Sequence, residues 1–503
     1  MFCSLRLVAR STEADATKMT PRRIATDGGF VRQASVLALG TILGQVAVLA
    51  GAPILTRLYQ PEAIGAWAFL SAIAMALANV GNGKYELAIV LPRSDGRAVN
   101  LVALCLFTQF CVLTLVCIGI VFVQSSAGEA LLDFPISSDI VWLVPVMVSA
   151  SALYAVCRYW TVRKQQFGTL AGFIMLESWL LTALQIVAGL AMSGGAMEFV
   201  LAGVAAMVTL AMAFTTVVML QMCPSLGCLR AARILALAKR YRNFPVYSAP
   251  YAFLGMASSR ILLVLFGFYA APAAVGYFAL AMRVTSLPNA LVSSALNNAF
   301  FSWASRHVND REAFAGLIRR VLHPMIILGA PGVVLFVLNA EWLFAMVFGA
   351  DWAEAGRYAR YLVVGSFALL LSAWLDNVYS VLQKQKLSLV LESIYDLAMV
   401  TSVFVCLAVY RDPLLAVIVF SVTTALYNIV WLVVMFVVVK LPAALFFEII
   451  GLLLLMVVIA LAVHGLAGLL LGFVGYALAC CGFLMLLGIY SGRSLYTFAK
   501  GTA

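Results

Sequence analysis

LTRLYQPEAIGAWAFLSAIAMALANVGNGKYELAIVLP, residues 55 to 92, is the stretch that decides the fold. It contains the end of one apolar segment, a short polar turn, a second apolar segment and a charged return that includes Tyr85 and Glu86. A helix needs about 20 apolar residues to cross a hydrocarbon core of about 30 Å. Two such segments joined by a polar turn predict a transmembrane helical hairpin.

The composition extends this prediction to the whole chain. Hydrophobic residues make up 64% of the 503 residues and charged residues only 11%, whereas soluble proteins have about 25% charged residues. We therefore predict an all-α polytopic membrane protein with about 14 transmembrane helices. The predicted spans lie near residues 35–55, 63–82, 98–123, 139–157, 170–192, 197–221, 245–269, 275–303, 321–340, 359–381, 388–410, 414–438, 443–463 and 467–490.

The distribution of Lys and Arg predicts the orientation, because these residues accumulate in cytoplasmic loops. With the N-terminus inside, most basic residues fall in the inner loops, so both termini are predicted to be cytoplasmic. Residues 1–34 lack the apolar core of a secretory signal and are predicted to be a basic cytosolic tail. The net charge of +11 thus reflects topology, and no basic patch of a soluble domain supports nucleic-acid binding.

An internal repeat divides the chain. The segment PEAIGAWAF, which begins at Pro61, recurs as PAAVGYFAL from Pro272, in the same predicted outer turn. Two copies in the same orientation indicate parallel repeats related by an axis along the membrane normal. We predict two six-helix lobes plus two additional C-terminal helices. The predicted domains are a tail (1–34), an N-terminal lobe (35–229), a basic linker (230–243), a C-terminal lobe (244–440) and the two extra helices with a short cytosolic tail (441–503).

Residues 55–92 resemble the N-terminal signature of bacterial polysaccharide and O-antigen flippases of the multidrug/oligosaccharidyl-lipid/polysaccharide exporter superfamily. Similar matches occur at YRNFPVY (241–247), VGYFALAMRVTSLP (275–288) and VFGADWAEAGRY (347–358). The resemblance implies transport of a polyprenyl-diphosphate-linked oligosaccharide across the bacterial inner membrane, by alternating access of two lobes. It also implies contact with membrane lipid and, as candidate partners, a polysaccharide polymerase and chain-length proteins.

Such a cargo needs a cavity that accepts sugar hydroxyls and holds an anionic head. An Arg within a span costs at least about 2.5–3.5 kcal/mol, so it usually faces a partner or a watery cavity. Its planar fork also suits a diphosphate. Arg260 could instead extend its side chain to the headgroups, and polar side chains could simply join helices. The candidate substrate-binding residues are Arg283, Arg260, Arg57, Asn79, Asn82, Glu86, Ser286 and Asn297.

Acidic residues inside the predicted spans form a second set, whose burial would suit proton or sodium coupling. The alternative is that they pair with Lys384, Lys386 or Arg163 near the interface. The ion-coupling candidates are Glu177, Asp376, Glu392 and Asp396. We expect no metal site and no cofactor beyond such an ion, because the ten cysteines lack metal-ligand spacing and the three histidines are isolated.

Other functions remain as alternatives. An enzyme is not expected, because none of the predicted outer loops carries a plausible acid, nucleophile or metal cluster, and we assign no catalytic residue. A cation-coupled multidrug exporter of the same superfamily would rely on acidic residues in its cavity and would lack Arg there. A peptidoglycan lipid-precursor flippase would share both the fold and a cationic cavity. The sequence does not specify which glycan is carried.

Overall fold

The computed structural model describes residues 27–125, 138–192, 194–304, 310–376, 378–382, 384–470 and 482–488. Every regular element in these ranges is a helix. The long helices are α2 (Asp27–Leu58), α3 (Pro61–Gly81), α4 (Asp95–Val123), α7 (Leu143–Arg163), α8 (Phe167–Ala191), α9 (Ala196–Met222), α11 (Ala249–Tyr269), α12 (Pro272–Ala304), α13 (Arg311–Phe348), α14 (Ala353–Ser372), α16 (Gln385–Ala408), α17 (Pro413–Val439) and α18 (Ala443–Leu470). The shorter elements are η1 (Tyr85–Val90), α6 (Ser138–Val141), η2 (Cys223–Cys228), α10 (Ala231–Arg240), η3 (Phe244–Ser248), η4 (Ala350–Trp352), η5 (Ala373–Leu375) and α15 (Val378–Val381).

The predicted fold class is confirmed. Eleven helices in the described ranges are long and apolar enough to cross a membrane. Helices α11 and α12, of 21 and 33 residues, occupy the positions predicted for the seventh and eighth spans. Most of the predicted fourteenth span, 467–490, lies outside the described residues, as does most of the tail at 1–34. The chain is therefore a multi-pass helical membrane protein.

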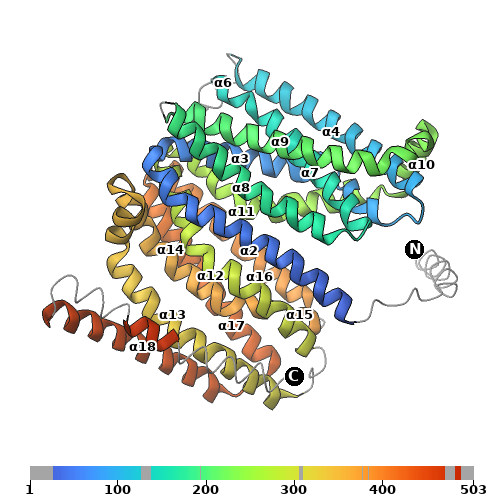
Figure 1. The fold of residues 1–503 in the computed structure, drawn as a ribbon. Coiled ribbons are helices and arrows are strands. Elements are labelled where there is room, and N and C mark those ends of the chain that lie inside the picture. The colour runs from blue at the N-terminus through green and yellow to red at the C-terminus, as the bar shows by residue number, and fades with distance from the viewer. Residues whose placement is uncertain are drawn as a thin grey trace.

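The helices form two packed groups (Figure 1). We call α2 to α9 the first half and α11 to α17 the second half. In the first half α2 packs on α8 and α7 packs on α9, whereas in the second half α14 packs on both α13 and α17. Helix α18 packs on α13 and is otherwise set apart, with only 6% of its most apolar window buried. Helix α3 joins the halves, because it packs on α7 and α9 and also on α11 and α12.

The two copies of the sequence repeat contact each other. A Cβ atom added to Gly65 would lie 2.1 Å from the carbonyl oxygen of Pro272, and one added to Gly276 would lie 2.0 Å from that of Pro61. Each glycine therefore lets its helix approach the backbone of the other copy, as small residues do between membrane helices. We call this reciprocal contact the glycine crossing. It lies at the Pro61 end of the bundle, where α3 and α12 begin.

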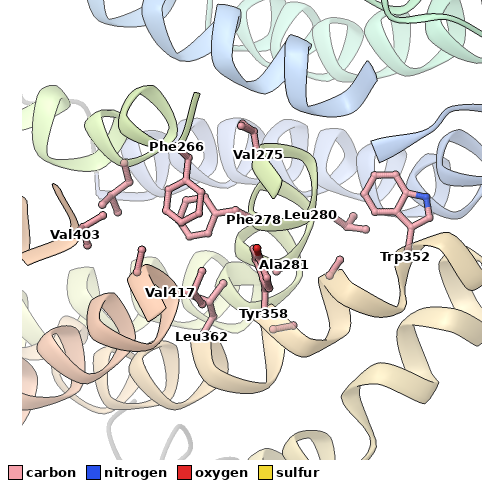
Figure 2. Packing of buried hydrophobic residues seen from close by; sticks show 14 of the residues in the cluster. Phe266, Val275, Phe278, Leu280, Ala281, Trp352, Tyr358, Leu362, Val403 and Val417 are labelled. Carbon is pink, nitrogen blue, oxygen red and sulfur yellow. The ribbon is translucent and has the colours of Figure 1, made fainter. Parts of the chain in front are cut away.

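A buried apolar cluster supports α12 below this crossing (Figure 2). The rings of Phe266 and Phe278 stack with their centroids 4.3 Å apart and nearly parallel. Trp352 is 1% exposed, and its indole Nε1 donates a hydrogen bond of 2.8 Å to the carbonyl oxygen of Thr56 on α2. This bond crosses from the second half to the first. The cluster thus fixes the position of α12 relative to both α11 and α2.

At the opposite end, which we call the Glu86 end, ionic contacts hold the loop between α3 and α4. The carboxylate of Asp95 lies 3.1 Å from the guanidinium of Arg163 and 2.7 Å from the ammonium of Lys164. Arg163 also donates to the carbonyl oxygens of Ile89 and Pro92. Arg163 therefore pairs with Asp95, the first residue of α4, rather than with one of the ion-coupling candidates.

Candidate functional site

A cavity of about 310 Å³ lies between the two halves, nearer to the Pro61 end. Helices α2, α3, α8 and α9 form its wall on the first-half side, and α11 and α12 form the other wall. Many of the lining residues are apolar, including Leu55, Phe199 and Phe278. Its polar lining residues are Thr56, Ser71, Thr182 and Gln185 from the first half and Arg260, Arg283 and Ser286 from the second half.

Arg283 and Ser286, both predicted from the sequence as substrate-binding candidates, stand three positions apart on one face of α12. Both line the cavity from α12, and the Ser286 hydroxyl donates to the carbonyl oxygen of Arg283 at 3.2 Å. Arg283 has an exposed side chain although it lies within a span, because that side chain borders the cavity. Arg260 lines the same cavity from α11, one helix away.

The two arginines have no counter-charge among the residues that the structure describes. Among the described residues no carboxylate forms an ion pair with either guanidinium. A cation within a membrane span and without a partner is costly, so such groups usually face another charge or a watery cavity. None of the described residues that line the cavity is acidic. The arrangement is therefore suited to an anion that enters from outside the chain.

The predicted group on α3 lies elsewhere. The Asn79 side chain donates 2.8 Å to the carbonyl oxygen of Ala252 on α11 and accepts 2.6 Å from the ammonium of Lys84. Asn82 is 1% exposed and donates 2.8 Å to the Ala152 carbonyl oxygen on α7. Both residues sit toward the Glu86 end of α3, and neither lines the cavity. Their spacing of three residues puts them on one helical face, but spacing does not give the depth of that face in the bundle.

Glu86 lies beyond the end of α3, in η1, and is 4% exposed. Its carboxylate is 3.7 Å from the ammonium of Lys84, and its Oε2 atom has no hydrogen-bond partner among the described residues. Burial raises the pKa of Glu86, and the nearby Lys84 offsets only part of that rise. This carboxyl group therefore lies buried at the Glu86 end, outside the described lining of the cavity.

Arg57 and Asn297 complete the substrate-binding candidates. Arg57 is exposed in the last turn of α2, outside the cavity lining, and its guanidinium lies 3.4 Å from the carbonyl oxygen of Met346 on α13. Asn297 lies on α12, but its side chain is outside the described part of the structure. Neither residue therefore adds a described group to the cavity.

The structure brings three of the four acidic candidates together. Glu392 interacts electrostatically with Asp376 and with Asp396, which lies one turn further along α16. Glu177 belongs to the other half, on α8, where its charged neighbour is Arg158 of α7. The carboxylates therefore form a cluster in the second half and a separate site in the first. In the ranges that the structure describes, no group of His, Cys, Asp or Glu is arranged to hold a metal ion.

Sequence reasoning missed Ser71, Thr182 and Gln185 on the first-half wall. Thr182 and Gln185 stand at i and i+3 on α8 and are 8% and 3% exposed. The hydroxyl of Tyr59 donates 2.8 Å to the Gln185 backbone carbonyl oxygen, which fixes α8 against the end of α2. The spacing of these two polar residues within an apolar span was the signal that could have identified them.

The described helices form a membrane-spanning bundle with a cavity between its two halves. The family model described as polysaccharide biosynthesis protein matches residues 54–357. The chain therefore belongs to this family, which confirms the resemblance found in the sequence. No curated protein sequence matches the chain.

Solved structures define the fold further. The chain is similar to the lipid II flippase MurJ in an inward closed conformation, with a TM-score of 0.66 and 11% identity over 93% of this chain and 99% of that one. It is also similar to an inward-facing MATE family multidrug resistance transporter of the MOP superfamily. There the TM-score is 0.56 and the identity 15%, over 80% of this chain and 95% of that one. At these identities the likeness establishes a shared fold.

Proposed function

We propose that this protein moves a polyprenyl-diphosphate-linked oligosaccharide across the bacterial inner membrane for polysaccharide biosynthesis. The observation that carries the proposal is that Arg260 and Arg283, which line a cavity between the two halves, form no ion pair with any described residue. A diphosphate offers the negative charge that both guanidinium groups lack, and a guanidinium binds two of its oxygens at once. The family membership supports the same cargo class.

The low polarity around the arginines strengthens their attraction for an anion. Phe278, Leu280 and Leu263 border the same cavity, so the local dielectric is low and a charge-assisted hydrogen bond is worth about 1.5–3 kcal/mol. A volume of 310 Å³ lies at the lower end of the range of about 300–1,000 Å³ for ligand sites. It suits the diphosphate and an adjoining sugar, whereas the rest of the oligosaccharide and the polyprenyl tail would lie outside it.

Transport would proceed by alternating access of the two halves as lobes. The halves touch on both sides of the cavity, at the glycine crossing near the Pro61 end and at the bond from Asn79 to Ala252 toward the Glu86 end. If the halves separate at one of these contacts and stay together at the other, the cavity opens only toward the side that has separated. With both termini cytoplasmic, the Pro61 end faces the periplasm. The polyprenyl tail stays in lipid while the charged head crosses.

The two alternatives from the sequence differ in their fit to the cavity. A cation-coupled multidrug exporter would need acidic groups around its cargo, and the described cavity lining instead carries two arginines. A peptidoglycan lipid-precursor flippase would suit the same cationic wall, and its support is the fold shared with MurJ. The difference between these two lipid cargoes lies in the sugars rather than in the diphosphate.

The proposal is tested with purified protein in liposomes that carry a radiolabelled polyprenyl-diphosphoryl-oligosaccharide. The readout is the fraction of lipid that becomes accessible to an external glycosidase that cannot cross the membrane. Arg283→Ala should lower transport at least tenfold, because the loss of one charge-assisted contact costs about 1.5–3 kcal/mol. Arg283→Lys keeps the charge but loses the planar fork, so it should retain part of the activity.

The matched control is Arg357→Ala, which removes an exposed arginine paired with Glu354 at 3.4 Å on α14. This variant should transport like the wild type, since exposed ion pairs contribute little. Normal transport by Arg283→Ala would overturn the assignment of the cationic wall. Failure of the wild type to move the lipid, together with export of a cationic drug, would instead support the multidrug alternative.

A further inference from the structure

The first-half wall of the cavity is polar but uncharged. It carries Thr56 from α2, Ser71 from α3, and Thr182 and Gln185 from α8. We call these four residues and Trp67 the amide wall, and we call Arg260, Arg283 and Ser286 the arginine wall. The two walls come from different halves of the chain, so the cavity presents neutral donors and acceptors on one side and positive charge on the other.

Gln185 is the central residue of the amide wall. Its side chain is 97% buried, and its Nε2 atom has no hydrogen-bond partner among the described residues. More than nine in ten buried polar groups in proteins are paired, so an unpaired buried amide calls for a partner that the chain does not supply. The bond from Tyr59 to its backbone carbonyl holds this position of α8 beside the cavity. The backbone of α8 is therefore held beside the cavity at this position, and the amide nitrogen has no partner among the described residues.

An aromatic side chain accompanies this amide. Trp67 borders the same cavity from α3 and packs edge-on against Phe199, with the ring centroids 6.5 Å apart. A Cβ atom at Gly203 would lie 2.4 Å from the Trp67 ring, so α9 leaves room for the indole. A fixed aromatic face beside an amide and hydroxyl groups fits the two surfaces of a sugar ring, which are apolar C–H groups and hydroxyl groups.

We propose that the amide wall binds the first sugar of the cargo, with Gln185 as the residue that recognises it, while the arginine wall binds the diphosphate. This inference rests on the proposed function. It divides recognition between the halves, because α11 and α12 bind the charged diphosphate and α3 and α8 bind the sugar. The bound head then bridges the two halves across the cavity.

The test compares two lipids that differ only in the sugar. Undecaprenyl diphosphate and undecaprenyl-diphosphoryl-N-acetylglucosamine compete for the purified full chain, and native mass spectrometry gives the ratio of the two complexes. The wild type should prefer the sugar-bearing lipid by roughly tenfold, the value expected for paired polar groups in a buried site. Gln185→Met keeps the length of the side chain but removes the amide, so it should lower the preference to near one and leave binding of the bare lipid unchanged.

Two further variants make the result decisive. Gln221→Met is the matched control, because the amide of Gln221 lies outside the cavity lining and donates 3.0 Å to Gln166, and it should keep the wild-type preference. Thr182→Val removes a hydroxyl from the amide wall at constant shape, and it replaces Gln185→Met if that variant does not fold. Arg283→Ala should weaken both lipids equally.

The outcomes separate the inference from the function on which it rests. An unchanged sugar preference in Gln185→Met, or in Thr182→Val if that variant is used, would overturn the amide wall as a sugar site while leaving the diphosphate site intact. A wild type that binds both lipids equally would do the same. A wild type that binds neither lipid would overturn the proposed function, and the inference with it.

Discussion

The glycine crossing gives a prediction whose size follows from its geometry. In Gly65→Ala the new methyl carbon would lie 2.1 Å from the carbonyl oxygen of Pro272, whereas ordinary contacts begin at 3.4 Å. Because the obstacle is backbone, α3 and α12 must separate by roughly 1 Å or more to relieve the clash. Overpacking of this kind costs about 1–3 kcal/mol, and each 1.4 kcal/mol is a factor of ten in an equilibrium. The closed form of the Pro61 end should therefore lose about fivefold to a hundredfold in population relative to the open form.

The assay is a distance measurement between the halves. Spin labels replace Met192 after α8 and Val409 after α16, both of which are exposed, in a chain whose ten native cysteines have been replaced. Double electron–electron resonance in nanodiscs then reports the separation of the two labels. Gly65→Ala and Gly276→Ala should each shift the distribution to longer distances. The double variant should shift it by less than the sum, because both methyl groups act on one interface.

The control is Gly119→Ala on α4, which makes the same change within a helix where nothing lies within 4 Å of the added carbon. Its distance distribution should match that of the wild type. If Gly65→Ala and Gly276→Ala also gave the wild-type distribution, with unchanged transport, the glycine crossing would not be the closing contact. The reasoning from the backbone clash would then be refuted.

Two further predictions concern stability in detergent, followed by circular dichroism on heating. Trp352→Phe removes the buried indole N–H that donates to the Thr56 carbonyl oxygen. The free energy of unfolding should fall by about 1–3 kcal/mol. An unchanged melting curve would mean that this hydrogen bond does not hold the halves together. Burial raises the pKa of Glu86. Between the ordinary carboxyl pKa and the raised one, the folded chain therefore keeps a proton that the unfolded chain has released. Stability should fall as the pH rises through this range. Glu86→Gln should remove that part of the decline, and an identical pH dependence in wild type and variant would show that Glu86 does not cause it.

Most of the fold could be predicted from the sequence because each helix is marked by its own residues. Long apolar runs give the spans, and prolines such as Pro61, Pro272 and Pro413 mark the first turns of helices, where a missing N–H costs nothing. The repeat at Pro61 and Pro272 also indicated two related elements. The repeat did not predict that its two copies contact each other through Gly65 and Gly276, because that contact depends on how the halves pack.

The site was only partly predictable for a related reason. Arg283 could be predicted because placing a charge within a membrane span costs free energy, and the sequence of one helix is enough to recognise such a charge. Asn79 and Asn82 have the same helical spacing as cavity residues, but they bond to α11 and α7 near the Glu86 end. Gln185 was overlooked because one amide in an apolar helix is a weak signal until the partners on neighbouring helices are known. Depth in the bundle and the identity of the facing helix are properties of packing, which a single span does not encode.

The position of α3 has a consequence for biogenesis. Its main partners in the other half, α11 and α12, are synthesised more than 160 residues later in the chain. Until those helices enter the bilayer, Gly65 and the aromatic face around Phe69 have only lipid or an insertion factor to contact. The nascent first half is thus an intermediate in which the face of α3 that packs on α11 and α12 is uncovered until translation passes Pro272. Ribosomal stalling before that point should leave a chain that membrane quality-control proteases can recognise.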